Sequence, residues 1–231
     1  PGDAASHYYR GLAYFDRGQY KAASRDFDSV IRLTQSNWQH YSSRAQVSFK
    51  YGDRSAVPDY TAAIRLNPTN VDLYIGRARS SHLQEDKLDD AIQDLDQAIA
   101  LDPQNGEAHY HRALVYIALG EPEQGIQDLN QTISLGGQYK EIYLNRAQAF
   151  RQIGQYDQAL SDLEQAIRLD PRDGFAYNER GQIYQALGQV EQAIDSYYLA
   201  DFDSPQRKQI IEYLTQTLYK NPLDLTASAL R

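Results

Sequence analysis

The feature that most constrains this chain is a segment that recurs about every 34 residues. The stretch "AIQDLDQAIALDPQN" at 91–105 returns as "ALSDLEQAIRLDPRD" at 159–173, and weaker copies begin at positions 56 and 125. The small residues that open the copies are separated by 33, 35, 34, 34 and 34 positions. They are Ala23, Ala56, Ala91, Gly125, Ala159 and Ala193. A fixed period in this range is typical of stacked supersecondary units, so we expect an array of six.

Each unit contains two helical patterns. In the second pattern Ala91, Leu95 and Ala98 recur at the spacing of one helix face. Prolines are expected to end these second helices, at Pro68, Pro103, Pro171 and Pro205. Glycines are expected to break the chain between the two helices, at Gly18, Gly52, Gly120, Gly154 and Gly188. One such hairpin cannot bury its apolar face alone, so a neighbouring unit must complete it.

The segment "YLNRAQAFRQIGQYDQALSDLEQAIRLDP" at 143–171 resembles the tetratricopeptide repeat in its order of small, aromatic, glycine and proline residues. The resemblance covers about 4–207 and implies an all-α fold, a right-handed solenoid of helical hairpins that forms a superhelix. We expect one such domain over 1–231, with repeats at about 4–37, 38–70, 71–105, 106–139, 140–173 and 174–207. A half-polar capping helix is expected at about 206–220, followed by a tail at 221–231.

Some units depart from the pattern of the family. Ser48 and Ser81 stand where other units have an aromatic residue, as in Tyr14, Tyr116, Phe150 and Tyr184. The units that differ in length gain or lose their residue around 52–55 and 85–87, which are expected to be turns. His7 and His109 stand in a column of tyrosines, so we expect them to pack in or near the core rather than to bind a metal.

Two charged columns run along the repeats. Every first helix carries an arginine at the same place, in Arg10, Arg44, Arg77, Arg112, Arg146 and Arg180. The second helices carry an aspartate column, in Asp26, Asp59, Asp94, Asp128 and Asp162, with Asp195 one residue out of register in the sixth unit. An arginine ladder could bind phosphates, but each arginine has a carboxylate opposite it and the net charge is −8. We therefore predict one Arg–Asp pair in each hairpin and no nucleic-acid partner.

A second stripe along the first helices changes from unit to unit, although a packing stripe would repeat. The resemblance implies that this stripe lines the concave inner surface of the solenoid. The predicted groove residues are Tyr8, Leu12, Phe15, Phe49, Arg79, His82, Tyr110, Leu114, Ile117, Leu144 and Arg151, with Glu107 and Glu141 on an acidic rim. The same stripe also includes Ser42, Gln46 and Ile75, and the rim includes Asp72 and Glu179. We predict that the groove binds a peptide or extended segment of another protein, with an apolar or aromatic anchor and basic residues. The opposing interpretation is that these side chains only pack against neighbouring first helices.

A structural assembly or oligomerisation scaffold is the alternative function. It would act through the convex face or the solenoid ends, where Tyr197 and Tyr198 would matter, and it leaves self-association possible.

An enzyme is not predicted, because the chain has no cysteine, no phosphate loop and no nucleophile motif. For the same reasons we expect no cofactor and no metal. The longest apolar run is the seven residues at 113–119, so no membrane span is expected. The compartment stays open; the chain starts at Pro1 and lacks methionine, which favours a soluble piece of a longer or processed bacterial protein.

Overall fold

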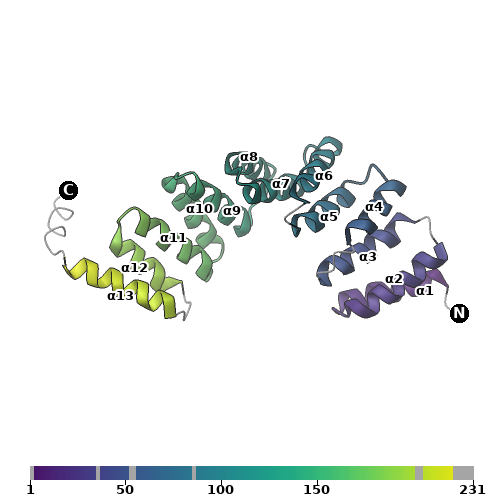
Figure 1. Cartoon of the computed structure of the whole chain (residues 1–231), viewed down its shortest axis with the longest axis horizontal. Coiled ribbons are helices and arrows are strands. Elements are labelled where there is room, and N and C mark those ends of the chain that lie inside the picture. Colours follow the sequence, from purple (N-terminus) through teal and green to yellow (C-terminus); the bar gives the residue numbers. More distant parts are fainter. Residues whose placement is uncertain (1–2, 35–36, 52–55, 85–86, 201–204, 221–231) are drawn as a thin grey trace. The chain divides into compact units, whose positions relative to one another are not determined.

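The structure is a computed structural model that describes residues 3–34, 37–51, 56–84, 87–200 and 205–220, with the side chains of 205–207 and 217–220 excepted. Within these ranges the chain forms thirteen α-helices and no β-strand (Figure 1). The helices are α1 (Ala4–Asp16), α2 (Tyr20–Thr34), α3 (Trp38–Tyr51), α4 (Ala56–Leu66), α5 (Val71–His82), α6 (Leu88–Leu101), α7 (Gly106–Leu119), α8 (Pro122–Ser134), α9 (Lys140–Gln152), α10 (Tyr156–Leu169), α11 (Gly174–Ala186), α12 (Val190–Leu199) and α13 (Pro205–Lys220).

The helices form two compact units. Unit 1 contains Pro1–Glu121 and Asn130–Leu135, and unit 2 contains Pro122–Leu129 and Gly136–Arg231, so α8 contributes to both. Each unit is a stack of helical hairpins, which confirms the predicted all-α fold class. The single continuous domain over 1–231 stays a prediction.

Within each unit the hairpins stack in chain order. In unit 1, α1 packs against α2, α3 against α4 and α5 against α6, and each second helix also contacts the next first helix. The first helices touch one another as well, α1 with α3, α3 with α5, and α5 with α7. Unit 2 repeats this pattern in α9 to α13, with α9 in contact with α11. The first helices of unit 1 therefore form one layer, and any surface that they share is built from several hairpins.

Sequence signals explain where the helices end. Gly18, Gly120, Gly154 and Gly188 follow the first helices with φ between 70° and 78°, a left-handed conformation that favours glycine, as predicted. Gly52 and the length changes at 52–55 and 85–86 lie outside the described residues. Pro68, Pro103 and Pro171 follow α4, α6 and α10 by two residues, but the prediction was wrong for Pro205. Helix α12 already ends at Leu199, and Pro205 opens α13, where its missing N–H is not needed.

The repeated columns form the core. The alanines that open the repeated segments are almost completely buried, and so are Phe27, Leu95, Leu129 and Leu163. His109 is 7% exposed, and its Nε2 lies 3.1 Å from the carbonyl oxygen of Pro103. The tyrosine at the equivalent place in the third hairpin makes the same contact, since the Tyr74 hydroxyl donates to the Pro68 carbonyl at 2.9 Å. The prediction that His109 packs in the tyrosine column is therefore confirmed.

His7 is half-buried, and its Nδ1 lies 3.1 Å from the Asp26 carboxylate. The capping helix predicted at 206–220 is α13, and Leu214 packs against Ala193 and Tyr197 with Ile211 beside it.

Three glycines inside helices each face an aromatic ring from a second helix. A Cβ atom added to any of them would lie 2.5 to 2.9 Å from a ring carbon, closer than real contacts allow. The three pairs are Gly11 with Phe27, Gly76 with Tyr60, and Gly181 with Tyr197. Gly11 and Gly181 lie in the same hairpin as their ring, at a place where the hairpins of Leu95 and Leu163 have alanine, whereas Gly76 lies in the hairpin that follows Tyr60. In all three pairs the missing side chain leaves the space that the ring occupies.

Candidate functional site

The arginine column is bound inside the hairpins. Four arginines form bidentate pairs, with Nε donating to Oδ2 at 2.7 to 2.8 Å and the second guanidinium nitrogen donating to Oδ1 at 2.6 Å. The pairs are Arg10 with Asp26, Arg44 with Asp59, Arg77 with Asp94, and Arg146 with Asp162. All four aspartates are buried. These arginines are therefore structural, as predicted, and are not available to bind a phosphate.

The pairing has two features that the columns did not predict. In the sixth hairpin Ser196 takes the aspartate's place, and Arg180 Nε donates to its hydroxyl at 3.0 Å, so the predicted Arg–Asp pair is wrong there. The arginines also reach back to the preceding hairpin. The contacts are Arg44 with Asp28 at 2.7 Å, Arg77 with Thr61 at 3.1 Å and Arg112 with Asp96 at 2.7 Å. A polar column two residues after each aspartate was the signal that could have predicted this link.

The predicted groove stripe is partly open. In unit 1 its predicted apolar members are half-buried rather than enclosed, namely Tyr8, Leu12, Phe15, Phe49, Tyr110, Leu114 and Ile117. Two other positions of the same stripe, Ser42 and Ile75, are buried. Tyr8, Leu12 and Phe15 also pack against the terminal cluster around Phe27. For Tyr8 and Leu12 this packing role is the one that the structure supports.

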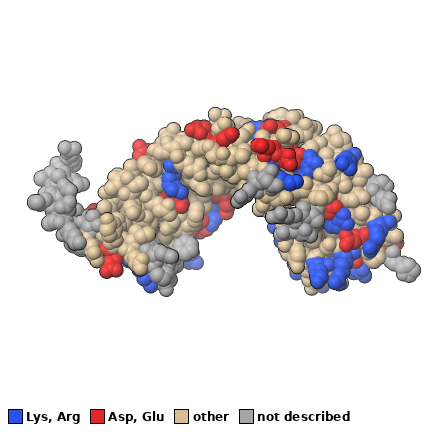
Figure 2. All heavy atoms as spheres, viewed as in Figure 1, with Lys and Arg blue, Asp and Glu red and all other residues tan. Residues whose placement is uncertain are grey.

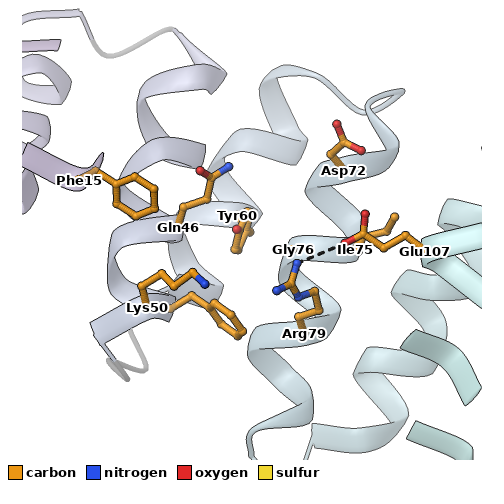
Figure 3. A pocket seen from close by; sticks show the side chains of 10 residues that line it. Phe15, Gln46, Lys50, Tyr60, Asp72, Ile75, Gly76, Arg79 and Glu107 are labelled. Atoms are coloured by element: carbon orange, nitrogen blue, oxygen red, sulfur yellow. Dashed lines mark hydrogen bonds and ion pairs between the residues drawn. The ribbon is translucent and has the colours of Figure 1, made fainter. Parts of the chain in front are cut away.

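A first cavity of about 390 Å³ lies among the first helices of unit 1 (Figure 3). It brings together four of the predicted residues, Phe15, Phe49, Arg79 and Glu107. The other lining residues are Gln46, Lys50, Tyr60, Asp72, Ile75 and Gly76. The cavity therefore spans α1, α3, α5 and α7, with one contribution from a second helix, α4.

A second, smaller cavity of about 210 Å³ adjoins the first. It is lined by the predicted His82 and Leu114, together with Ala78, Leu83, Leu95, His111 and Val115. Phe49 and Arg79 line both cavities. The Arg79 guanidinium lies 5.1 Å from the centre of the Phe49 ring, a cation–π contact that fixes this shared wall. Of the remaining predicted residues of unit 1, Tyr8, Leu12, Tyr110 and Ile117 do not line either cavity.

The charges of the first cavity are only partly paired. Arg79 contacts the Glu107 carboxylate at 3.3 Å, and His111 Nε2 lies 3.5 Å from the same oxygen. The hydrogen bond from His111 lowers the pKa of Glu107. Asp72 and Lys50, in contrast, have no ion pair with any described residue, and Figure 3 shows them on opposite sides of the cavity. Of the acidic rim, Glu107 is thus already occupied, and Asp72 is the carboxylate that a ligand can reach.

Burial, with a smaller effect of the nearby His111, lowers the pKa of His82 below its usual value. His82 is therefore neutral at pH 7, and the second cavity keeps its apolar character. On the face drawn in Figure 2, acidic and basic side chains are interspersed. The groove sites predicted in unit 2 have more local roles. Leu144 packs against the core of that unit, Arg151 Nε lies 3.2 Å from Glu179 Oε2, and Glu141 is exposed.

Sequence reasoning missed three lining residues of the first cavity, Lys50, Tyr60 and Gly76. Tyr60 stands in the column of Phe27, Leu95, Leu129 and Leu163, which are buried packing residues. The available signal was Gly76, a glycine inside a first helix at a place where other hairpins have larger side chains such as His111.

Within the described ranges, no three histidine, aspartate or glutamate side chains cluster in a way that could hold a metal ion. None of the helices in those ranges is long and apolar enough to cross a membrane.

Comparisons with known proteins agree with this architecture. A sequence model of the family described as "TPR repeat" matches residues 80–120 and 147–188, and one described as "Tetratricopeptide repeat" matches 106–135 and 176–201. A curated relative, the DnaJ homolog subfamily C member 7 homolog of Dictyostelium discoideum, is 35% identical over 102 residues. That match covers 42% of this chain and 19% of the relative, so the chain spans about a fifth of the relative's length.

Solved structures show the same fold. Pseudomonas aeruginosa pilF superposes with a TM-score of 0.76 at 14% identity, covering 91% of this chain and 96% of pilF. YrrB, a TPR protein with an unusual peptide-binding site, superposes with a TM-score of 0.60 at 20% identity, covering 75% of this chain and 95% of YrrB. The 34-residue period, the stacked hairpins and these matches lead to one conclusion: the chain belongs to the tetratricopeptide repeat family, a family of protein–protein interaction modules.

Proposed function

We propose that the chain binds an extended segment of a partner protein along the first helices of unit 1, without catalysing a reaction. The observation that carries the proposal is the pair of adjoining cavities, because residues from α1, α3, α5 and α7 line them together. YrrB, which shares the fold, has a peptide-binding site, and this supports peptide binding as a use of the fold. Concave sites lined by apolar and aromatic residues with a few polar groups are the usual form of binding sites.

The size and the chemistry of the cavities suggest the character of the segment. The second cavity, about 210 Å³, is smaller than the roughly 300 to 1,000 Å³ of a site for a drug-sized ligand, so it suits a single side chain. Leu114, Val115 and neutral His82 favour an aliphatic or aromatic residue there. In the first cavity, Asp72 favours a basic residue and Lys50 an acidic one, since neither forms an ion pair within the described part of the chain. The segment would thus place an apolar anchor next to charged residues.

Peptide binding by groove variants tests the proposal. Random 12-residue peptides, acetylated and amidated at their ends, are arrayed, and those that the wild-type chain retains serve as probes. Phe49→Ala and Leu114→Glu should weaken the binding of these probes at least tenfold, because they remove the shared wall and put a charge into the apolar cavity. Tyr51→Ala and Leu119→Glu are matched controls, since they alter exposed residues of the same helices that line neither cavity. Circular dichroism would check that each of the four variants folds.

Two results would reject the proposal. One is an array on which the wild-type chain retains no peptide. The other is equal binding by the groove variants and their controls.

The alternative is assembly through the last hairpin and α13. Tyr198 is 68% exposed and Tyr213 66%, and Leu199 is exposed as well. Tyr197, which the sequence pattern suggested for such a surface, is buried and cannot contribute to it. Light scattering distinguishes the two functions. A mass above that of one chain that falls in Tyr198→Ser and Tyr213→Ser would favour assembly, and a monomeric mass would reject it.

A further inference from the structure

Tyr60 reaches the groove although it belongs to α4, a second helix. The residue is only 5% exposed, and it lines the first cavity together with Gly76 of α5. A Cβ atom at position 76 would lie 2.5 Å from Tyr60 Cζ and 2.7 Å from its hydroxyl oxygen. The end of the ring therefore occupies the space that Gly76 leaves open, and Figure 3 shows it between the α3 and α5 residues of the cavity.

The Tyr60 hydroxyl has no hydrogen-bond partner among the described residues. This is unusual, because buried tyrosine hydroxyls generally find one. Tyr197 stands at the equivalent place in the sixth hairpin, and its hydroxyl donates to Gln185 Oε1 at 2.8 Å. In the second hairpin the position of Gln185 is held by Phe49, which offers no acceptor. The Tyr197 hydroxyl is therefore bonded within the fold, whereas the Tyr60 hydroxyl at the equivalent position faces a cavity.

The surroundings determine what the hydroxyl can bind. Burial raises the pKa of Tyr60 to about 12, so the group stays a hydrogen-bond donor over the physiological pH range. The cavity carries two cations, Lys50 and Arg79, and two carboxylates, Asp72 and Glu107. Their charges balance, so the cavity as a whole favours neither an anion nor a cation beside Tyr60. A neutral acceptor fits better, and an extended peptide presents such an acceptor in each backbone carbonyl.

We propose that Tyr60 is a ligand-binding residue, whose hydroxyl donates a hydrogen bond through the gap at Gly76 to a backbone carbonyl of the segment bound along the first helices. This inference rests on the proposed function and adds to it a contact from a second helix. Gly76 has a positioning role, because any larger residue would displace the ring.

The array peptides that the wild-type chain retains are the probes for this contact. Tyr60→Phe removes only the hydroxyl and should weaken their binding about three- to tenfold, with an unchanged urea midpoint. Tyr74→Phe is the matched control, because it removes a buried hydroxyl that is bonded within the fold. It should lower the urea midpoint and leave peptide binding unchanged.

A second measurement identifies the acceptor. Each backbone amide of the tightest peptide is replaced in turn by an ester, which weakens the carbonyl as an acceptor. At one position the ester should weaken binding to the wild-type chain and have a smaller effect on Tyr60→Phe, since the bond is already absent there.

The outcomes separate this inference from the proposed function. If Tyr60→Phe binds the peptides as tightly as the wild-type chain while Leu114→Glu loses them, the role of Tyr60 is overturned and the groove stands. The absence of any coupled ester position also overturns it. If Leu114→Glu also keeps full affinity, the proposed function itself is wrong.

Discussion

Substitution of Gly76 by alanine should destabilise the chain, although alanine is the better helix former. Gly76 lies inside α5, where replacing glycine by alanine ordinarily stabilises by about 0.5 to 1 kcal/mol. At this position the new methyl group would lie 2.5 Å from two ring carbons of Tyr60, about an ångström inside normal contact. Tyr60 is almost fully buried and has little room to move. Overpacking of this kind costs about 1 to 3 kcal/mol, so we expect a net loss of about 1 kcal/mol.

The repeat itself suggests the compensating change. Where the Tyr60 column holds leucine, the following hairpin has a larger side chain at the place of Gly76, namely His111 after Leu95 and Glu179 after Leu163. In a Tyr60→Leu background, Gly76→Ala should therefore stabilise by about 0.5 to 1 kcal/mol. The two substitutions would then be coupled by about 1.5 to 2 kcal/mol, well above the error of a double-mutant cycle.

Urea denaturation of the wild-type chain, both single variants and the double variant measures this coupling. Hydrogen exchange of the α5 amides reports the same free energy locally. If Gly76→Ala stabilises the wild-type chain as much as it stabilises Tyr60→Leu, the ring does not press on position 76. The steric explanation of the glycine–aromatic pairs would then fail, and with it the positioning role of Gly76.

Three further predictions concern the frame and the second cavity. Asp162→Asn should destabilise the chain by about 2 to 4 kcal/mol, because it leaves Arg146 without its buried carboxylate; an unchanged urea midpoint would refute this. The pKa of His82 in the folded chain lies below its ordinary value of 6.5. The contribution of His82 to the free energy of unfolding is therefore complete above pH 6.5 and is lost as the pH falls through the lowered folded value. His82→Gln should remove this part of the pH dependence of stability. Ser81 adjoins a cavity of about 260 Å³, and the next hairpin has Tyr116 at the equivalent position. Ser81→Tyr should therefore raise the melting temperature and stabilise the chain by about 1 kcal/mol. A lower melting temperature would show that the cavity cannot accept a ring.

The sequence was sufficient to predict what repeats. The period located the hairpins, the glycines located their turns, and the facing columns predicted the buried pairs such as Arg146 with Asp162. Features at the margins were harder to predict. Tyr8 and Leu12 belong to the inward stripe by position, but in the first hairpin they pack against the terminal cluster. The repeated pattern predicts the environment of a hairpin that has neighbours on both sides, and the first hairpin has a neighbour on one side only.

The missed residues of the site were hard to predict for one physical reason: their role depends on contacts between hairpins. Tyr60 is a packing residue by its column, and only Gly76, in the following hairpin, lets its ring end reach the groove. In the sixth hairpin the glycine lies in the same unit, at Gly181, and Tyr197 finds an acceptor in Gln185. The two tyrosines share a column but differ in neighbours that no single repeat contains. Binding specificity in such a frame therefore need not lie only in the variable inward stripe, because a glycine in one hairpin can convert a core side chain of the hairpin before it into part of the binding surface.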